Sequence, residues 1–228
     1  MNEEKGRPAV FLDRDGTIIV DAHFLDDPER IEILPGAVEG IRALNDAGIP
    51  VVIATNQSGV ARGYFDEETV TAIHERLLDL LAEREAVVDA VYYCPHLTLG
   101  SEIEYRKDCR CRKPGPGMAL IASRELGLDL SRSYVVGDKP SDLGFGRNIG
   151  GKSILVRTGK GKETERSIDS GEIDAAFDTL SGAAEYIIED LNKGSGFEDD
   201  GYSGSEILGE DGERQDPLPS MPALLRYF

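Results

Sequence analysis

Polar and charged residues follow several short apolar runs of this 228-residue chain. Because the carboxyl ends of parallel strands meet at one edge of a sheet, side chains that follow different strands can converge there. Four motifs, each after a predicted strand or just before a predicted helix, occur in order: DRDGT (13–17), TNQSG (55–59), RKP (112–114) and GDKPSD (137–142). The candidate site residues taken from them are three carboxylates, three cations and two neutral donors: Asp13, Asp15, Asp138, Arg112, Lys113, Lys139, Thr55 and Asn56.

The carboxylates of these motifs would repel one another if they converged. Two unit charges about 4 Å apart repel by roughly 4 kcal/mol at an effective dielectric constant of 20. Their pKa values would therefore rise unless a cation lay among them. A few carboxylate oxygens suit Mg²⁺, whose coordination is often completed by a substrate phosphate. Together with the neighbouring cations and neutral donors, they predict a site for a phosphoryl group.

The spacing of Asp13 and Asp15 fits covalent phosphoryl transfer. A carboxylate is already ionised at neutral pH, so Asp13 could attack phosphorus without a general base. Asp15 could protonate the leaving oxygen and later take a proton from water. Lys113, Thr55 and Mg²⁺ would stabilise charge on the equatorial oxygens. Each motif alone has a simpler interpretation as a turn, a loop or surface charge, but four in this order favour catalysis.

All three cysteines lie within 18 residues, in the pattern Cys94-x-His96, twelve residues, Cys109-x-Cys111. Three thiolates and one imidazole make the tetrahedral ligand set of a closed, structural zinc site. Zinc there would fix the loop that carries Arg112 and Lys113. The alternative is three reduced cysteines in a loop at the edge of a strand.

Apolar, β-branched runs alternate with helix-period segments. This alternation predicts a doubly wound, Rossmann-like α/β domain with a parallel sheet. In the second predicted helix, Val70, Ile73, Leu77 and Leu81 share one stripe, and Asp66 is the expected N-cap. The expected strands are 9–13, 50–56, 90–94, 133–138 and 153–156, and the expected helices are 35–48, 66–85 and 116–127.

The composition changes near residue 193. Residues 194–228 contain eight acidic and two basic residues among glycine and serine, with no apolar period. Such a composition predicts a disordered tail after a domain that spans residues 8–190. The last residues, PALLRYF, are apolar enough to dock on a surface, but a solvated tail is the preferred interpretation.

The formal net charge of −18 argues against nucleic acid and anionic membranes as partners. No apolar run approaches the roughly 20 residues that span a bilayer, and the N-terminus does not look like a secretory signal. An odd cysteine count fits a reducing compartment. We therefore expect a cytoplasmic monomer that acts on a small phosphorylated substrate.

The motifs resemble those of a known family. FLDRDGTI, TNQSG, CRKPGPGM and VGDKPSD resemble the four motifs of the haloacid dehalogenase (HAD) superfamily, which works through an aspartyl-phosphate. TNQSGVARGYF, YYCPH, CRCRKPGPGM and LVRTGKG are similar to the D,D-heptose 1,7-bisphosphate phosphatases and the related histidinol-phosphate phosphatases, over residues 8–190. The resemblance implies roles for the following residues: Asp13 as nucleophile, Asp15 as general acid/base, Asp13, Asp138 and the Asp15 carbonyl as Mg²⁺ ligands, Thr55 and Lys113 as phosphoryl ligands, Arg112 in substrate selection, and Cys94, His96, Cys109 and Cys111 as zinc ligands.

The intervals between the motifs leave no room for a separate cap domain. Only about twenty residues separate Asp15 from Pro35, and the zinc loop occupies residues 94–111. We expect an open site whose specificity is set by the zinc loop and by residues 20–24. The candidate substrate-binding residues are Asn56, Arg112, Lys139 and His23, whereas His74 is expected to be exposed. Gly144 and Gly146 should each weaken a helix after Asp142 by about 1 kcal/mol.

The resulting hypothesis is a Mg²⁺-dependent phosphatase acting on a sugar phosphate, with D-glycero-D-manno-heptose 1,7-bisphosphate, cleaved at C7, as the expected substrate. Histidinol phosphate or another small phosphomonoester is the alternative within this class. A catalytically inactive, phosphate-binding scaffold is the alternative from another class. The presence of Asp13, Asp15, Lys113 and Asp138 argues against such a scaffold.

Overall fold

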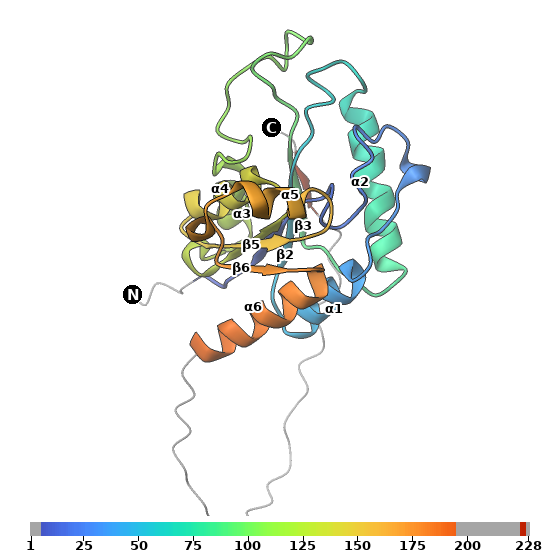
Figure 1. Ribbon diagram of the computed structural model, residues 1–228. Helices are drawn as coiled ribbons and strands as arrows, with labels where there is room; N and C mark the ends of the chain where they lie inside the picture. The colour runs from blue at the N-terminus through green and yellow to red at the C-terminus, as the bar shows by residue number, and fades with distance from the viewer. Residues whose placement is uncertain (1–5, 195–223, 227–228) are drawn as a thin grey trace, which may run out of the picture.

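The computed structural model describes residues 6–194 and 224–226. A parallel sheet in the order β6-β5-β4-β1-β2-β3-β7 forms its centre (Figure 1). The central strand β1 pairs with β2 on one side and with β4 on the other. Strands β2 and β3 are therefore added on one side of β1, and β4, β5 and β6 on the other. The strands are β1 Val10–Leu12, β2 Val51–Asn56, β3 Ala90–Cys94, β4 Tyr134–Gly137, β5 Lys152–Val156, β6 Ala175–Phe177 and β7 Leu224–Arg226.

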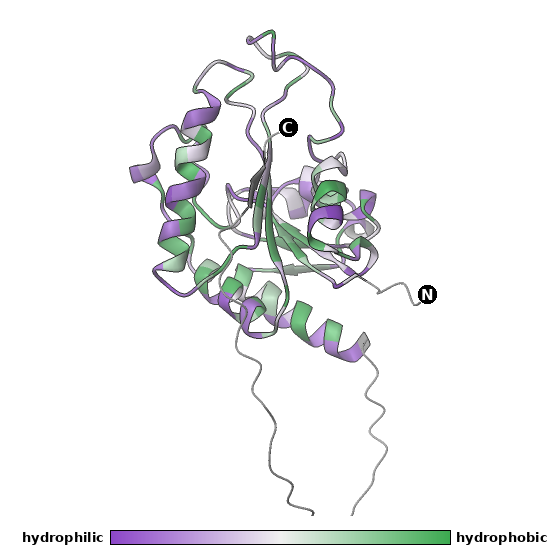
Figure 2. Ribbon diagram, turned by 180° about the vertical axis from the view of Figure 1, so that it is seen from behind, coloured by the Kyte–Doolittle hydropathy of each residue, from purple (hydrophilic) through white to green (hydrophobic). Residues whose placement is uncertain are grey.

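Helices cover both faces of the sheet. One core cluster joins α1, α2 and α6 to one face, and the other joins α3 and α4 to the opposite face. The central strands are hydrophobic on both sides, as expected for a sheet buried between two helical layers (Figure 2). The helices are α1 Ala37–Asp46, α2 Glu67–Ala82, α3 Gly117–Leu126, α4 Pro140–Asn148, α5 Gly161–Ser167 and α6 Leu180–Gly194, with 3₁₀ turns at Pro28–Arg30, Leu130–Arg132 and Ser170–Glu172.

The structure confirms the predicted doubly wound α/β fold. Every strand and helix predicted from the sequence is present, with ends that differ by at most three residues. Asp66 caps α2 as expected, because its Oδ1 accepts a hydrogen bond from the Thr69 backbone N–H at 2.8 Å. No separate cap domain occurs: among the described elements only the turn Pro28–Arg30 lies between β1 and α1, and none lies between β3 and α3. None of the helices in the described part is both long and apolar enough to cross a membrane.

The two glycines of α4 allow close packing. A Cβ atom on Gly144 would lie 2.9 Å from the Pro114 Cβ, and one on Gly146 would lie 2.3 Å from the Ser153 Oγ. The helix forms in spite of its low intrinsic propensity because its backbone packs directly against Pro114 of the RKP motif and against β5. The propensity that the sequence suggested is therefore overridden by tertiary contacts.

The end of the chain departs from the expected solvated tail. Leu224–Arg226 form β7, which pairs in parallel with Ala90–Tyr92 of β3. The rest of the predicted disordered segment, 195–223 and 227–228, lies outside the described residues. The described end of the tail thus extends the sheet at its β3 edge.

Candidate active site and metal clusters

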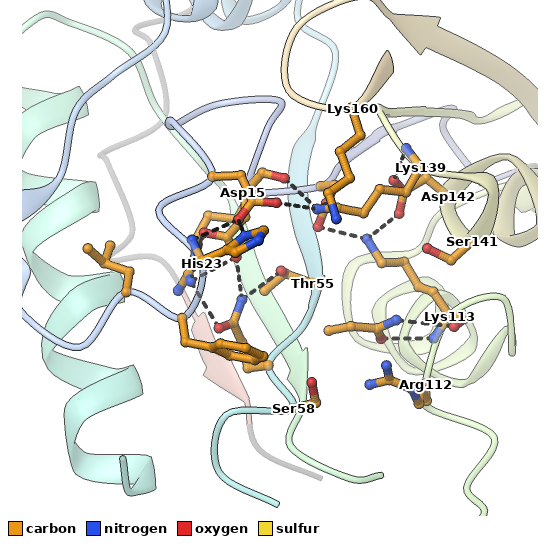
Figure 3. Close-up of a pocket in the computed structure, with 17 residues that line it drawn as sticks. Asp15, His23, Thr55, Ser58, Arg112, Lys113, Lys139, Ser141, Asp142 and Lys160 are labelled. Carbon is orange, nitrogen blue, oxygen red and sulfur yellow. Dashed lines mark hydrogen bonds and ion pairs between the residues drawn. The ribbon is translucent and has the colours of Figure 1, made fainter. Parts of the chain in front are cut away.

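A cavity of about 430 Å³ lies at the carboxyl ends of the central strands (Figure 3). The side chains come from the end of β2, from the loops that follow β1, β2, β4 and β5, and from α4 and the segment before α3. Asp138 is fully buried and lies beneath the residues that line the cavity. All the predicted catalytic and substrate-binding residues line it: Asp13, Asp15, Thr55, Lys113, Asn56, Arg112, Lys139 and His23.

Asp13 is held between two ammonium groups. Its Oδ1 lies 2.9 Å from the Lys113 Nζ, and its Oδ2 lies 3.3 Å from the Lys139 Nζ. Burial opposes ionisation of this carboxyl group, but the two lysines outweigh it and hold the pKa of Asp13 well below its usual value. Asp13 is therefore an ionised, buried carboxylate at the cavity wall, as a nucleophile that needs no base must be.

The Lys139 ammonium lies within 3.5 Å of four oxygens, one of which is the Asp21 Oδ2. Its Nζ is 2.7 Å from the Asp15 carbonyl oxygen, 3.3 Å from the Asp13 Oδ2 and 3.5 Å from the Asp138 Oδ1. These are the same three groups that the sequence predicts as Mg²⁺ ligands. The Asp138 Oδ1 is buried and accepts no hydrogen bond. Burial, reinforced by Asp13, raises the pKa of Asp138 to about 7 despite the opposing charge of Lys139. These three hard oxygen ligands, two of them from carboxyl groups, suit Mg²⁺.

Glycine is required where the backbone passes Asp138. Gly16 has a φ of +94° and Gly159 a φ of +49°, and a Cβ atom on either would lie 2.3 Å from the Asp138 Oδ2. The Lys160 backbone N–H donates a hydrogen bond to the same oxygen at 2.8 Å. One carboxylate oxygen of Asp138 is therefore fixed by backbone, which leaves the other free to meet a cation.

Besides Asp13, two residues hold Lys113 in place: Asp142 and Asn56. The sequence analysis gave no role to Asp142. The Lys113 Nζ lies 2.7 Å from the buried Asp142 Oδ1 as well as near Asp13. Asn56 accepts a hydrogen bond from the Lys113 backbone N–H at 2.9 Å and donates one to its carbonyl oxygen at 3.1 Å. Both polar groups of Asn56 are committed to this loop, so Asn56 holds Lys113 in place. Asp142 belongs to the GDKPSD motif, which was the sequence signal that could have identified it.

We define the acidic cluster as Asp13, Asp138 and Asp142, each of which offers one carboxylate oxygen within 4.8 Å of the others.

Asp15 is surrounded by donors. Its carboxylate accepts hydrogen bonds from the Arg14 Nε at 3.1 Å and Nη2 at 2.9 Å, and from the Gln57 Nε2 at 2.8 Å. Gln57 also donates to the Thr55 Oγ1 at 2.9 Å. The Arg14 Nη1 lies 3.1 Å from the His74 Nε2. The expectation that His74 is exposed is therefore wrong: the side chain is 1% exposed, because it lies against the equally buried Arg14.

The rim of the cavity is built by residues with unusual backbone angles. His23 and Phe24 have φ values of 51° and 64°, in the left-handed region that non-glycine residues rarely adopt. The His23 side chain is 80% exposed, and the Phe24 ring meets Tyr64 edge-on with 4.8 Å between centroids. The Arg62 guanidinium lies 5.6 Å from the centre of the Phe24 ring. This loop thus presents an imidazole and an aromatic ring at the mouth.

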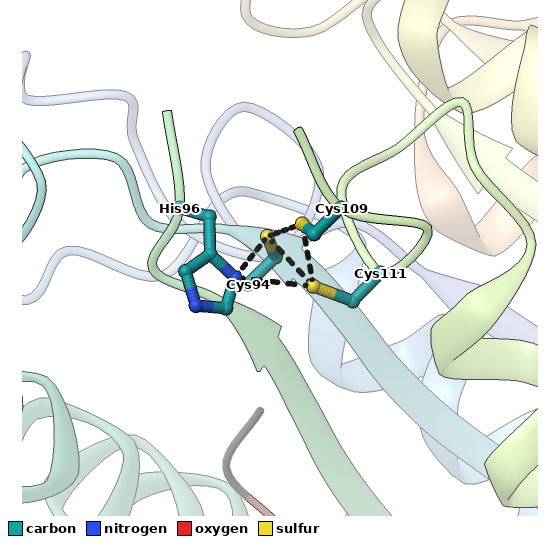
Figure 4. Close-up of side chains that lie close together, drawn as sticks. All are labelled: Cys94, His96, Cys109 and Cys111. Atoms are coloured by element: carbon teal, nitrogen blue, oxygen red, sulfur yellow. Dashed lines mark hydrogen bonds between the residues drawn. The ribbon is translucent and has the colours of Figure 1, made fainter. Parts of the chain in front are cut away.

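The thiol cluster consists of Cys94, His96, Cys109 and Cys111, whose ligand atoms lie within 4.8 Å of one another (Figure 4). The Sγ atoms are 2.8–3.4 Å apart, and the His96 Nδ1 is 3.4 Å from the Cys111 Sγ. None of the three cysteines forms a disulfide. A hydrogen bond from Cys111 lowers the pKa of Cys94 to about 6, although burial opposes this shift. The arrangement brings together the four predicted zinc ligands.

Two contacts attach the loop of the thiol cluster to neighbouring parts of the protein. The Arg112 Nη1 donates a hydrogen bond to the His96 carbonyl oxygen at 3.2 Å. On the other side, the Tyr105 hydroxyl donates to the Glu67 Oε2 at 3.0 Å, in the first turn of α2. The loop between Cys94 and Cys111 is thus attached both to the lysine-bearing segment and to α2.

Comparison with known proteins gives a matching family model and several similar sequences. A HAD-hydrolase-like family model matches residues 110–183. A D-glycero-β-D-manno-heptose-1,7-bisphosphate 7-phosphatase of Photorhabdus laumondii is 45% identical over 163 residues, which cover 71% of this chain and 86% of that protein. The enzyme of the same name from Escherichia coli K12 is 45% identical over 158 residues, covering 68% and 82%.

Solved structures agree with these sequence matches. The D,D-heptose 1,7-bisphosphate phosphatase of B. bronchiseptica, in complex with magnesium and phosphate, has a TM-score of 0.71 at 36% identity and covers 80% of this chain and 99% of its own. The enzyme from Burkholderia thailandensis has a TM-score of 0.58 at 33% identity, with coverages of 80% and 99%. The chain therefore belongs to the HAD-like phosphoric monoester hydrolases, in the family of the D-glycero-D-manno-heptose-1,7-bisphosphate 7-phosphatases.

Proposed function

We propose that the protein is a Mg²⁺-dependent phosphatase that removes the C7 phosphate from D-glycero-β-D-manno-heptose 1,7-bisphosphate. The observation that carries this proposal is the position of Asp13: an ionised, buried carboxylate held between Lys113 and Lys139 at the wall of an open cavity. The β anomer and the C7 position follow from the names of the relatives with 45% identity.

In the proposed reaction Asp13 attacks phosphorus and the bond between phosphorus and the C7 oxygen breaks. Asp15, as a carboxylic acid, gives its proton to the leaving oxygen and so releases an alcohol. The Asp15 carboxylate then takes a proton from water, whose oxygen attacks the aspartyl-phosphate and displaces the Asp13 carboxylate. Inorganic phosphate leaves, and both aspartates return to their starting forms. Lys113 and Thr55 hold the phosphoryl oxygens.

Two metal ions fit the residues described. Mg²⁺, which a related structure contains, would be held by Asp13, Asp138 and the Asp15 carbonyl and would supply positive charge beside the phosphoryl group. Zinc would be held by the thiol cluster and would stabilise the loop that ends at Arg112 and Lys113.

The substrate carries a second phosphate, which requires cations beyond the reacting centre. Arg112 and Lys160 line the cavity outside the acidic cluster and are available for this purpose. His23 lies on the rim and can contact the sugar. We propose that these three residues, with Lys139, discriminate between a bisphosphate and a monophosphate.

The test is phosphate release from four compounds with Mg²⁺ present: the α and β heptose 1,7-bisphosphates, heptose 7-phosphate and histidinol phosphate. We expect the β bisphosphate to have the highest kcat/KM, and Asp13→Asn to remove turnover of every compound. Asp46→Asn, which changes an exposed carboxylate on α1, is the matched control. A preference for histidinol phosphate would replace the proposed substrate, and turnover by Asp13→Asn within tenfold of wild type would refute the mechanism.

A further inference from the structure

The residues around Asp15 include three that the proposed reaction does not use. Arg14 is 1% exposed and Gln57 is 5% exposed. Both direct their donors at the Asp15 carboxylate, where they occupy both of its oxygens. Burying an arginine costs several kcal/mol unless its donors are satisfied. Here they are satisfied by the group that must exchange a proton with the substrate.

His74 completes the arrangement from α2. Arginine can only donate hydrogen bonds, so the His74 Nε2 must accept from the Arg14 Nη1, and the imidazole proton must lie on Nδ1. Burial, followed by the charge of Arg14, holds the pKa of His74 well below its usual value, so the ring is neutral. Its Nδ1 is buried without a hydrogen-bond partner, which costs about 1–3 kcal/mol.

That cost argues against a purely structural role for His74. The helix α2 places apolar residues at the neighbouring buried positions, including Val70 and Leu77. A histidine with one unsatisfied nitrogen packs less favourably there than another apolar residue would. What it supplies, and an apolar residue cannot, is an acceptor that fixes the plane of the Arg14 guanidinium.

We propose that Arg14, Gln57 and His74 are positioning residues that hold the Asp15 carboxyl group in the orientation needed for proton transfer. This inference rests on the proposed function. The Gln57 amide also donates a hydrogen bond to the Thr55 Oγ1. One side chain therefore contacts both the proton-transfer residue Asp15 and the phosphoryl-binding residue Thr55. A change in any of the three should slow the step in which the leaving oxygen gains its proton while phosphoryl binding is retained.

Leaving-group dependence tests this directly. The parameter kcat/KM covers steps up to the first irreversible one, in which the bond between phosphorus and the leaving oxygen breaks. An alkyl alkoxide leaves only with a proton, whereas the phenolate of p-nitrophenyl phosphate leaves without one. For His74→Phe, Arg14→Lys and Gln57→Leu we expect kcat/KM for a primary-alkyl sugar phosphate to fall by about 10²-fold. For p-nitrophenyl phosphate we expect a loss of less than about tenfold.

Two further variants separate positioning from packing. His74→Gln keeps an acceptor for Arg14 and should restore much of the alkyl-ester activity that His74→Phe loses. Leu77→Met changes the same helix by a volume-conserving substitution and should leave the ratio of the two esters unchanged. If Arg14→Lys does not fold, the His74 and Gln57 variants carry the test.

The outcomes are distinguishable. Equal losses with both esters, or wild-type activity with both, would overturn the positioning role. Turnover by Asp13→Asn would instead show that the proposed function is wrong, because that variant removes the nucleophile and leaves Arg14, Gln57 and His74 in place.

Discussion

The acidic cluster and the thiol cluster are built in opposite ways. The thiol cluster draws its four ligand atoms from one segment of 18 residues. The acidic cluster draws Asp13 and Asp142 from positions 129 apart in sequence, and two lysines lie within it. The first arrangement suits a permanent ion with a closed coordination shell, and the second suits a cation that enters with substrate.

The charges make the same distinction. In the acidic cluster the lysines already neutralise much of the negative charge, so this part of the protein can fold before a divalent ion binds. In the thiol cluster three sulfurs and an imidazole lie together, and hydrogen bonds from Cys111, Cys109 and His96 lower the pKa of Cys94 against the opposing effect of burial. We infer that metal at the thiol cluster contributes to stability and that metal at the acidic cluster contributes to catalysis.

The strongest test of the acidic cluster is Lys113→Met. It leaves the buried Asp13 and Asp142 without their shared cation, so we expect kcat/KM to fall at least about 10³-fold and stability to fall by about 3–5 kcal/mol. Phosphate release and urea unfolding measure the two effects. Lys162→Met, at an exposed position of α5, is the control. A stable, active Lys113→Met protein would remove the central cation from the mechanism.

The thiol cluster should fail differently. Elemental analysis of the wild-type protein should find about one zinc per chain, and Cys109→Ser should reduce it. We expect the melting temperature of the variant to fall by about 5–10 °C, which corresponds to the loss of a few kcal/mol in a chain of this size. Ser101→Ala, an exposed position in the same loop, should change neither quantity. A zinc-free wild type of full stability would contradict this interpretation.

Lys139→Met tests whether the Lys139 ammonium and Mg²⁺ compete for the same oxygens. The Lys139 ammonium occupies the oxygens that would hold Mg²⁺, and two like charges about 4 Å apart repel by several kcal/mol. Removing it should lower stability without Mg²⁺ and tighten Mg²⁺ binding at least about tenfold, as measured by calorimetry. An unchanged Mg²⁺ affinity would mean that the ion binds elsewhere.

Asn56→Ala tests the loop that connects the two clusters. The chain offers a matched control, because Asn45 makes the same pair of hydrogen bonds with the Val87 backbone, far from the cavity. We expect each variant to lose about 1–2 kcal/mol of stability. Only Asn56→Ala should lower kcat/KM, by about tenfold, because only Asn56 holds the Lys113 backbone. Equal activity of the two variants would show that this loop needs no such support.

The smallest predicted effect concerns α2. Glu67 of this helix contacts the loop of the thiol cluster, and His74 contacts Arg14, which in turn contacts Asp15. The pKa of His74 is depressed in the folded protein, so the unfolded chain binds a proton first as pH falls below about 6.5. Stability should therefore be lost below that pH, with a slope of at most about 1.4 kcal/mol per pH unit. His74→Gln should lack this component in urea unfolding between pH 5 and 7. Identical slopes would mean that His74 is protonated in the fold.

The predicted site residues lie together in the structure because a parallel sheet brings strand ends to one edge whatever their separation in the chain. Asp13 and Asp138 each follow a strand and Thr55 lies at the carboxyl end of one, so the fold class alone implied that they meet. The thiol cluster was predictable for the opposite reason, since its ligands are local and their spacing is specific.

What the sequence did not show are contacts between side chains of different elements. His74 follows Val70 by four positions and precedes Leu77 by three, so it lies on the buried stripe of α2, but its charged neighbours favoured exposure. Its burial depends on Arg14, which belongs to another element. For Leu224–Arg226 the sequence offered docking on a surface only as the less favoured interpretation and did not indicate pairing with β3, because the hydrogen bonds of an edge strand have no side-chain signature.

This last pairing has a practical consequence for handling the protein. A chain shortened to the length of its relatives would leave the backbone N–H and C=O groups of Ala90–Tyr92 open on their outer side. Open edges of this kind recruit strands from other molecules, so the trimmed protein would be the more prone of the two to aggregate. Leu224–Arg226, which cover this edge, would then protect the protein from aggregation.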